Sequence, residues 1–159
     1  MRRGARLLLG AFGLACAAAR PVTLEAGPRD YVASDYRRVY ERWTRDAEAY
    51  AWTELEDVLR VTATFEAWDF RWAYVVRYAQ DHSLLPDQRE ALLQATLSDA
   101  GANHRFFLTL AGQYYREGNL AARSTAWRVL LVDPEGGQPA PVEIERLRRP
   151  RAAERGYFP

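Results

Sequence analysis

The sequence lacks lysine and contains a single cysteine, Cys16. One cysteine excludes an intrachain disulfide and any zinc site built from several cysteines. The 22 basic residues, all arginine, nearly balance 21 acidic ones, and the net charge of +1 gives no electrostatic basis for binding nucleic acid. Of the protein classes that remain, a globular domain fits best, because 48% of the 159 residues are hydrophobic and 13% are aromatic.

The first fifteen residues have the pattern of an export signal. Arg2, Arg3 and Arg6 form a positively charged leader, and nine apolar or small residues follow over 7–15. Nine residues are far fewer than the roughly 20 that a membrane-spanning helix needs, but they suit a secretory signal whose basic end stays in the cytoplasm. We therefore predict a signal peptide over residues 1–15.

The end of this run resembles the lipobox of bacterial lipoprotein precursors, through the residues Gly13-Leu14-Ala15-Cys16. Ala15 is the small residue that the lipobox places before its cysteine, whereas Gly13 stands where Leu, Val or Ile is usual. The resemblance implies that Cys16 becomes the mature N-terminus and carries acyl chains such as palmitate. It also implies a protein of the cell envelope, anchored in the outer membrane and facing the periplasm, because two or three acyl chains hold a protein stably on a bilayer.

The alternatives are an ordinary secretory signal that is cut after Ala17 or Ala19 and a signal that is retained as an anchor. A free thiol in an oxidising compartment is a liability unless it is modified, which favours acylation of Cys16. Cleavage before the cysteine leaves 19 basic and 21 acidic residues. The mature net charge of −2 gives no support for a polybasic contact with the membrane.

Residues 17–32 contain Pro21, Gly27 and Pro28 and few periodic apolar positions, which is typical of a flexible spacer. We predict a lipidated N-terminus and tether over 16–34 and one domain over 35–159.

Two segments near the start of this domain predict a β-hairpin over 43–65. Residues 43–51 alternate between small or apolar and polar side chains, and Leu59, Val61, Ala63 and Phe65 alternate with polar residues. Asp35 is placed to cap a short helix before the hairpin, over 36–41. A helix that continues from Arg45 to Tyr50 is the alternative for the first strand, since Ala and Glu favour helices.

A helix pair is predicted over 68–81 and 86–100. Trp68, Trp72, Val75, Val76 and Ala79 follow helical spacing, which would leave Arg71 and Arg77 on the polar side. Pro86 suits a first helical position, and Gly101 suits a helix stop.

Strand patterns return near 106–110 and in a hairpin near 125–147, which turns at Asp133-Pro134-Glu135-Gly136-Gly137. This order predicts an α+β fold with an antiparallel sheet and an inserted helix pair. Tyr157 and Phe158 suggest that the final segment returns to the core.

The body of the chain resembles uncharacterised envelope proteins of GC-rich Gram-negative bacteria, through residues 60–65, 71–78 and 127–132. This resemblance implies no catalytic or binding residues. Similar chains continue past Pro159 with one more strand, which implies that this chain is shortened.

No reactive constellation is recognisable in the sequence. His82 and His104 are far apart along the chain, with no G-x-S-x-G or H-E-x-x-H motif, so we predict no catalytic residues, metal or cofactor. Tyr114, Tyr115 and Arg116 lie in a polar loop and are the predicted contact with an envelope protein partner. The expected function is non-enzymatic binding or a structural role at a membrane. The alternative is a small secreted hydrolase that uses His82 or His104 with a nearby carboxylate.

Overall fold

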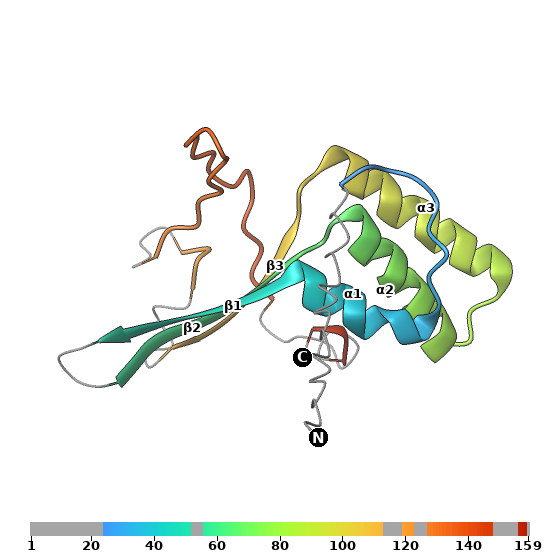
Figure 1. Ribbon diagram of the computed structural model, residues 1–159, viewed down its shortest axis with the longest axis horizontal. Coiled ribbons are helices and arrows are strands. Elements are labelled where there is room, and N and C mark those ends of the chain that lie inside the picture. Colours follow the sequence, from blue (N-terminus) through green and yellow to red (C-terminus); the bar gives the residue numbers. More distant parts are fainter. Residues whose placement is uncertain (1–23, 52–55, 113–118, 123–126, 148–155, 159) are drawn as a thin grey trace, which may run out of the picture.

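The computed structural model describes residues 24–51, 56–112, 119–122, 127–147 and 156–158. Within these ranges the chain forms three α-helices and a three-stranded antiparallel sheet (Figure 1), which confirms the predicted α+β class. A 3-10 turn over Ala33–Asp35 leads into α1 (Tyr36–Trp43), and α2 (Trp68–Asp81) and α3 (Pro86–Ala102) form the predicted helix pair. The helices gather at one end of the sheet, and the strands extend away from them.

The sheet has the order β1 (Thr44–Ala51), β2 (Glu56–Phe65) and β3 (Phe106–Gly112). The hairpin predicted over 43–65 and the strand predicted near 106–110 are therefore confirmed. The alternative of a helix over 45–50 is wrong, because residues 44–51 pair with β2 from Thr44 opposite Thr64 onward.

The register gives the sheet two different faces, because side chains alternate along a strand and directly opposed residues share a face. Leu59, Val61, Ala63 and Phe65 lie on one face, as their alternation predicts. The other face, which we call the threonine face, carries Thr44 opposite Thr64, Asp46 opposite Thr62, and Thr109 next to Thr62 on β3.

Helix α2 lies at the centre of the core and contacts two groups of buried side chains. On the α1 side, Tyr36, Val39, Phe70 and Ala73 pack together with Tyr157, and on the α3 side Val75 packs with Leu93 and Leu97. Burial of a valine, leucine or phenylalanine side chain contributes about 1.5–3 kcal/mol to folding. The apolar side chains of α2 therefore pack against both α1 and α3.

The helix ends follow local chemistry. Pro86 begins α3 as predicted, and the side chain of Gln88 accepts a hydrogen bond from the Leu85 amide at 3.0 Å. The helix continues past Gly101 to Ala102, two residues beyond the predicted end. Asp35 precedes α1, but its side chain makes no capping bond to the helix and instead pairs with Arg38 at 2.8 Å.

The hairpin predicted near 125–147 forms only in part among the residues that the structure describes, since 127–147 contain no strand. The two sides of the turn still face each other, because the amides of Leu131 and Asp133 donate to the carbonyls of Pro139 at 3.3 Å and Gly137 at 3.0 Å. In the turn itself, Oδ1 of Asp133 accepts hydrogen bonds from the amides of Glu135 at 3.0 Å and Gly137 at 2.6 Å. Pro139 and Pro141 remove two amide donors at alternate positions, and so from the same edge of the expected second strand. The alternation of apolar and polar residues over this segment does not reveal that these two amide donors are missing.

Both ends of the described chain pack against α2. The indole of Trp68 donates to the carbonyl of Gly27 at 2.8 Å, and Arg29 pairs with the buried carboxylate of Asp69 at 2.6 Å. Part of the segment predicted as a tether over 16–34 thus belongs to the surface of the domain. Tyr157 is buried in the aromatic group on the α1 side, so the final segment does return to the core.

Candidate functional site

The predicted lipidation site, Cys16, and the predicted partner contact at Tyr114, Tyr115 and Arg116 lie outside the described residues. Their roles stay predictions.

The two histidines occupy different places. His82 ends α2, where its Nδ1 lies 3.0 Å from the carbonyl of Tyr78 and its ring stacks on the Tyr78 ring at 3.9 Å. His82 thus directly follows the helix predicted over 68–81. His104 is exposed and meets Phe65 edge-on. Among the described residues, neither histidine forms a hydrogen bond to a carboxylate or a hydroxyl, so these contacts add no support to the hydrolase alternative.

A groove of about 710 Å³ runs between α1, the end of α2 and the final described residues. We call it the tyrosine groove, and its lining includes Tyr36, Tyr40, Arg77, Asp81, His82 and Tyr157. The helical segments place these side chains together although Tyr36 and Tyr157 are far apart in sequence. Aromatic and arginine side chains are enriched in binding surfaces, where they give a large contact area with polar ends.

A hydrogen-bond network fixes one wall of the tyrosine groove. Oδ2 of Asp81 accepts from Nε of Arg77 at 2.8 Å and from the hydroxyl of Tyr157 at 2.9 Å. Burial opposes charge on Asp81, but these two bonds outweigh it and lower the pKa of the carboxyl. Burial raises the pKa of the Tyr36 and Tyr157 hydroxyls. The wall therefore presents a carboxylate and neutral phenols at neutral pH.

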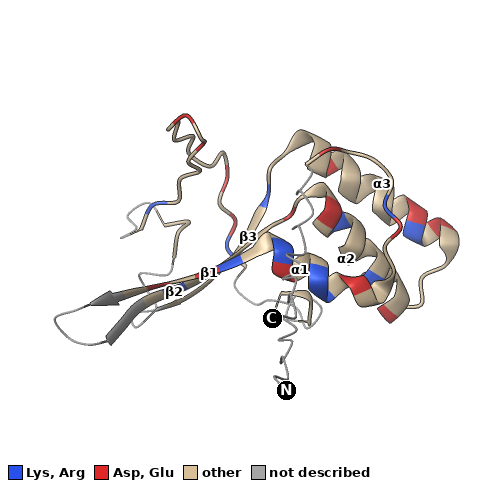
Figure 2. Ribbon diagram, viewed as in Figure 1, with Lys and Arg blue, Asp and Glu red and all other residues tan. Residues whose placement is uncertain are grey.

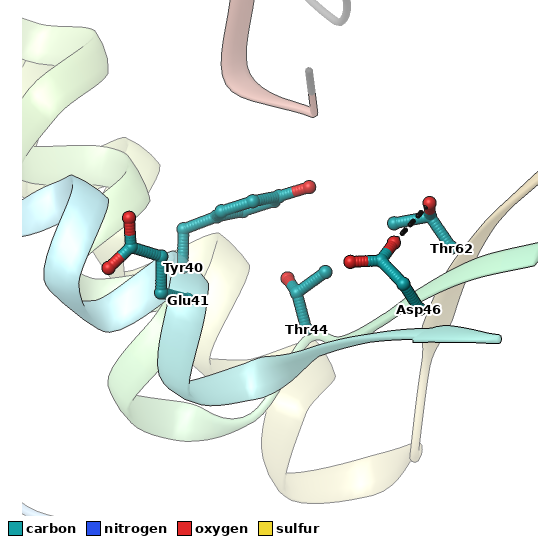
Figure 3. Close-up of a pocket in the computed structure, with 5 residues that line it drawn as sticks. All are labelled: Tyr40, Glu41, Thr44, Asp46 and Thr62. Carbon is teal, nitrogen blue, oxygen red and sulfur yellow. Dashed lines mark hydrogen bonds between the residues drawn. The ribbon is translucent and has the colours of Figure 1, made fainter.

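A second, smaller pocket of about 250 Å³ adjoins the tyrosine groove, and the two share Tyr40 and Glu41. We call it the hairpin pocket; its lining is Tyr40, Glu41, Thr44, Asp46 and Thr62. The ring of Tyr40 reaches over the pocket from the end of α1, while Asp46 and Thr62 face it from the threonine face (Figure 3). The hydroxyl of Thr62 donates to Oδ1 of Asp46 at 2.6 Å.

Charged residues of both signs are spread over the helices (Figure 2), but two charged side chains of α2 are buried. Arg71 was predicted on the polar side of α2, and this is wrong: its guanidinium bonds to Asp99 of α3 and to the carbonyl of Glu66 at 2.9 Å. The bond from Arg71 is the main reason that the pKa of Asp99 falls to about 2. Asp69 is buried against Arg29. These pairs join the helices and the N-terminal segment, and they lie apart from both pockets.

Comparisons with known protein families, curated proteins and solved structures find no match to this chain. In the described ranges, no helix combines the length and apolar character needed to cross a bilayer. The same ranges hold no group of three or more His, Cys, Asp and Glu side chains placed to bind a metal ion.

Proposed function

We propose that the protein is an exported lipoprotein, held at the periplasmic face of the outer membrane through acylated Cys16, and that its domain binds another envelope component without catalysing a reaction. The observation that carries this proposal is the position of the only cysteine, directly after an apolar run with a basic leader. Acyl chains stabilise membrane attachment by roughly 0.8 kcal/mol per buried CH₂ group.

The contacts of the N-terminal segment support a short link to the membrane. Among the described residues, Gly27 and Arg29 contact α2, and residues 17–26 lie between Cys16 and Gly27. Ten residues reach at most about 33–36 Å when fully extended. An acylated Cys16 would therefore hold the domain close to the bilayer, where a partner in the same membrane is within reach.

The binding role is supported by the tyrosine groove, which offers aromatic surface and both hydrogen-bond donors and acceptors. The loop with Tyr114, Tyr115 and Arg116 is retained in the proposal as a further partner contact. The chemistry of the tyrosine groove does not depend on the anchor.

The test of the anchor compares Cys16→Ser with Gly13→Leu, which restores the usual lipobox residue. We expect wild type and Gly13→Leu to incorporate labelled palmitate and to sediment with membranes, and Cys16→Ser to do neither. Mass spectrometry of the mature N-terminus provides a second measurement. A wild-type protein that is cut after Ala17 or Ala19 and carries no acyl group would overturn the proposal in favour of plain secretion.

The test of the binding role is crosslinking and affinity purification of the tagged protein from membranes. We expect a partner to be recovered in stoichiometric amount with wild type. Recovery of the bait alone would count against the binding role and leave the anchor untouched.

A further inference from the structure

We propose that the hairpin pocket binds the positively charged side chain of an arginine or lysine in a polypeptide partner, with the neighbouring part of the partner lying along the tyrosine groove. This inference rests on the binding role proposed above and specifies the chemistry of the partner.

The geometry of the hairpin pocket leaves one carboxylate oxygen for a ligand. The hydroxyl of Thr62 occupies Oδ1 of Asp46, whereas Oδ2 has no hydrogen-bond partner among the described residues. The ring of Tyr40 extends over the same space (Figure 3). A carboxylate beside an aromatic face favours a cation, because the ring presents its negative quadrupole and the carboxylate supplies full charge.

The charge of the pocket lining is negative, since it contains Glu41 and Asp46 and no basic residue. The closest arginines along the sheet are engaged elsewhere. Arg60 pairs with Glu48 at 2.6 Å, and Arg45, which lies on the opposite face of the sheet from Asp46, donates to backbone carbonyls at the end of α1. Charge complementarity therefore selects a basic ligand over a neutral or acidic one.

One ion pair borders the pocket and must yield or rearrange when a cation binds. Arg37 contacts Glu41 at 3.0 Å, but the two side chains are 88% and 61% exposed. An exposed pair of this kind contributes little free energy, so exchange of Arg37 for a ligand cation at Glu41 costs little.

The partner is a polypeptide rather than a small amine because the binding surface is longer than one side chain. The hairpin pocket lies next to the tyrosine groove of about 710 Å³, because Tyr40 and Glu41 line both. There, Arg77 and Asp81 provide a donor and an acceptor beside aromatic surface, which suits the amides and apolar side chains of an extended segment.

The experiment measures binding of short fluorescein-labelled peptides to the full-length protein by fluorescence polarisation at low salt. The probes are an alanine-glycine peptide with one central arginine, and the same peptide with citrulline, which keeps the shape of arginine but is neutral. We expect the arginine peptide to bind at least about tenfold more tightly and to lose affinity as salt is raised. Equal affinity of the two peptides, or no binding of either up to millimolar concentration, would overturn the inference.

Two variants locate the site. Asp46→Asn keeps the shape of the side chain and removes its charge, and we expect it to abolish most of the preference for arginine over citrulline. Glu90→Gln, a matched change at an exposed carboxylate on α3, should leave the preference unchanged. Thermal unfolding of each variant confirms that the fold is intact. An undiminished preference in Asp46→Asn would contradict the assignment to this pocket.

Two further comparisons test whether the ligand must be a polypeptide and whether binding is independent of the lipid anchor. Agmatine carries a guanidinium without a peptide backbone, and we expect it to compete only weakly; competition as strong as that of the arginine peptide would overturn the polypeptide part. Cys16→Ser should bind the arginine peptide as wild type does. A protein that is acylated but shows no arginine preference would refute this inference and leave the lipid anchor standing.

Discussion

The hydroxyl of Tyr36 on α1 donates a hydrogen bond to the backbone carbonyl of Tyr157, across 121 positions of sequence. The ring of Tyr157 packs edge-on against Tyr36 and Tyr74, and its own hydroxyl donates to Asp81. Its neighbour Phe158 stacks on Phe107 of β3 with ring centroids 4.0 Å apart. Residues 157 and 158 thus connect α1, α2 and the sheet.

This connection makes Tyr157 a sensitive position for stability. Tyr157→Ala should lower the free energy of unfolding by about 3–5 kcal/mol, because it removes a buried aromatic ring. Tyr157→Phe keeps the ring, loses only the bond to Asp81, and should cost about 0.5–1.5 kcal/mol. Urea unfolding followed by tryptophan fluorescence measures both. Equal and small losses would show that the segment contributes little to the core.

The pair formed by Arg29 and Asp69 should stabilise the N-terminal segment on α2. Arg29→Ala leaves the nearly inaccessible Asp69 carboxylate without its partner, and we expect a loss of about 3 kcal/mol. Arg37→Ala breaks an exposed pair and serves as the matched control, with an expected change within about 0.5 kcal/mol. Thermal unfolding distinguishes them, and similar melting temperatures for the two variants would argue against a structural role for residues 27–31.

The bond from Arg71 gives Asp99 a defined effect on acid stability. The pKa of Asp99 falls from its usual 3.8 to about 2 in the folded protein, chiefly through Arg71. A carboxyl with a lowered pKa adds stability that is complete above pH 4 and disappears as pH falls towards 2. The stability difference between wild type and Asp99→Asn should therefore shrink over this window, as followed by urea unfolding at a series of pH values. A difference that stays constant down to pH 2 would contradict the assignment.

Glu66 provides a contrast, because its carboxylate lies near the same arginine as Asp99: 3.8 Å from Arg71 and 3.7 Å from Arg105. Burial raises the pKa of its carboxyl despite the nearby Arg105 and Arg71, so its charged form is disfavoured in the folded state. The stability that this group contributes is present below the usual pKa of 4.5 and is lost as pH rises through the higher folded value. We expect Glu66→Gln to change the pH profile in the opposite sense to Asp99→Asn. Profiles of the same sign would show that ion pairing outweighs burial at Glu66.

The turn at Asp133 should be locally ordered and of little consequence for the domain. Asp133→Ala removes the acceptor for the amides of Glu135 and Gly137, and we expect faster amide hydrogen exchange at these two positions. The melting temperature should change by no more than about 2 °C, because the described residues around the turn form no strand. A large drop in melting temperature would indicate that the turn supports the core.

The helices and the first hairpin could be predicted because their signals are local. Pro86 begins α3, and the alternation of 59–65 matches the observed register. Among its described residues, the later hairpin forms two backbone hydrogen bonds between its sides but no strand, because Pro139 and Pro141 lack the amides that a strand needs for pairing. The helix predicted over 68–81 matches α2, but the prediction that Arg71 lies on its polar side is wrong, because Arg71 is buried.

The wrong placement of Arg71 and the failure to predict the two pockets from the sequence have a common physical cause. Arg71 is buried because Asp99, 28 residues later, neutralises it, and helical periodicity carries no information about such a partner. The tyrosine groove likewise combines α1, the end of α2 and Tyr157. The sequence signal that pointed towards it was the aromatic pair Tyr157-Phe158 after a run of arginines, which suggested a return to the core without showing where.

The aromatic group that joins α1, α2 and Tyr157 also bears on the timing of folding. It cannot assemble on the ribosome before residues 157 and 158 have been synthesised and released from the exit tunnel. Bringing together positions this distant carries a loop-closure cost and slows folding. For a chain that must be threaded through a translocation channel, as the proposed export requires, this late closure delays completion of the part of the core between α1 and α2.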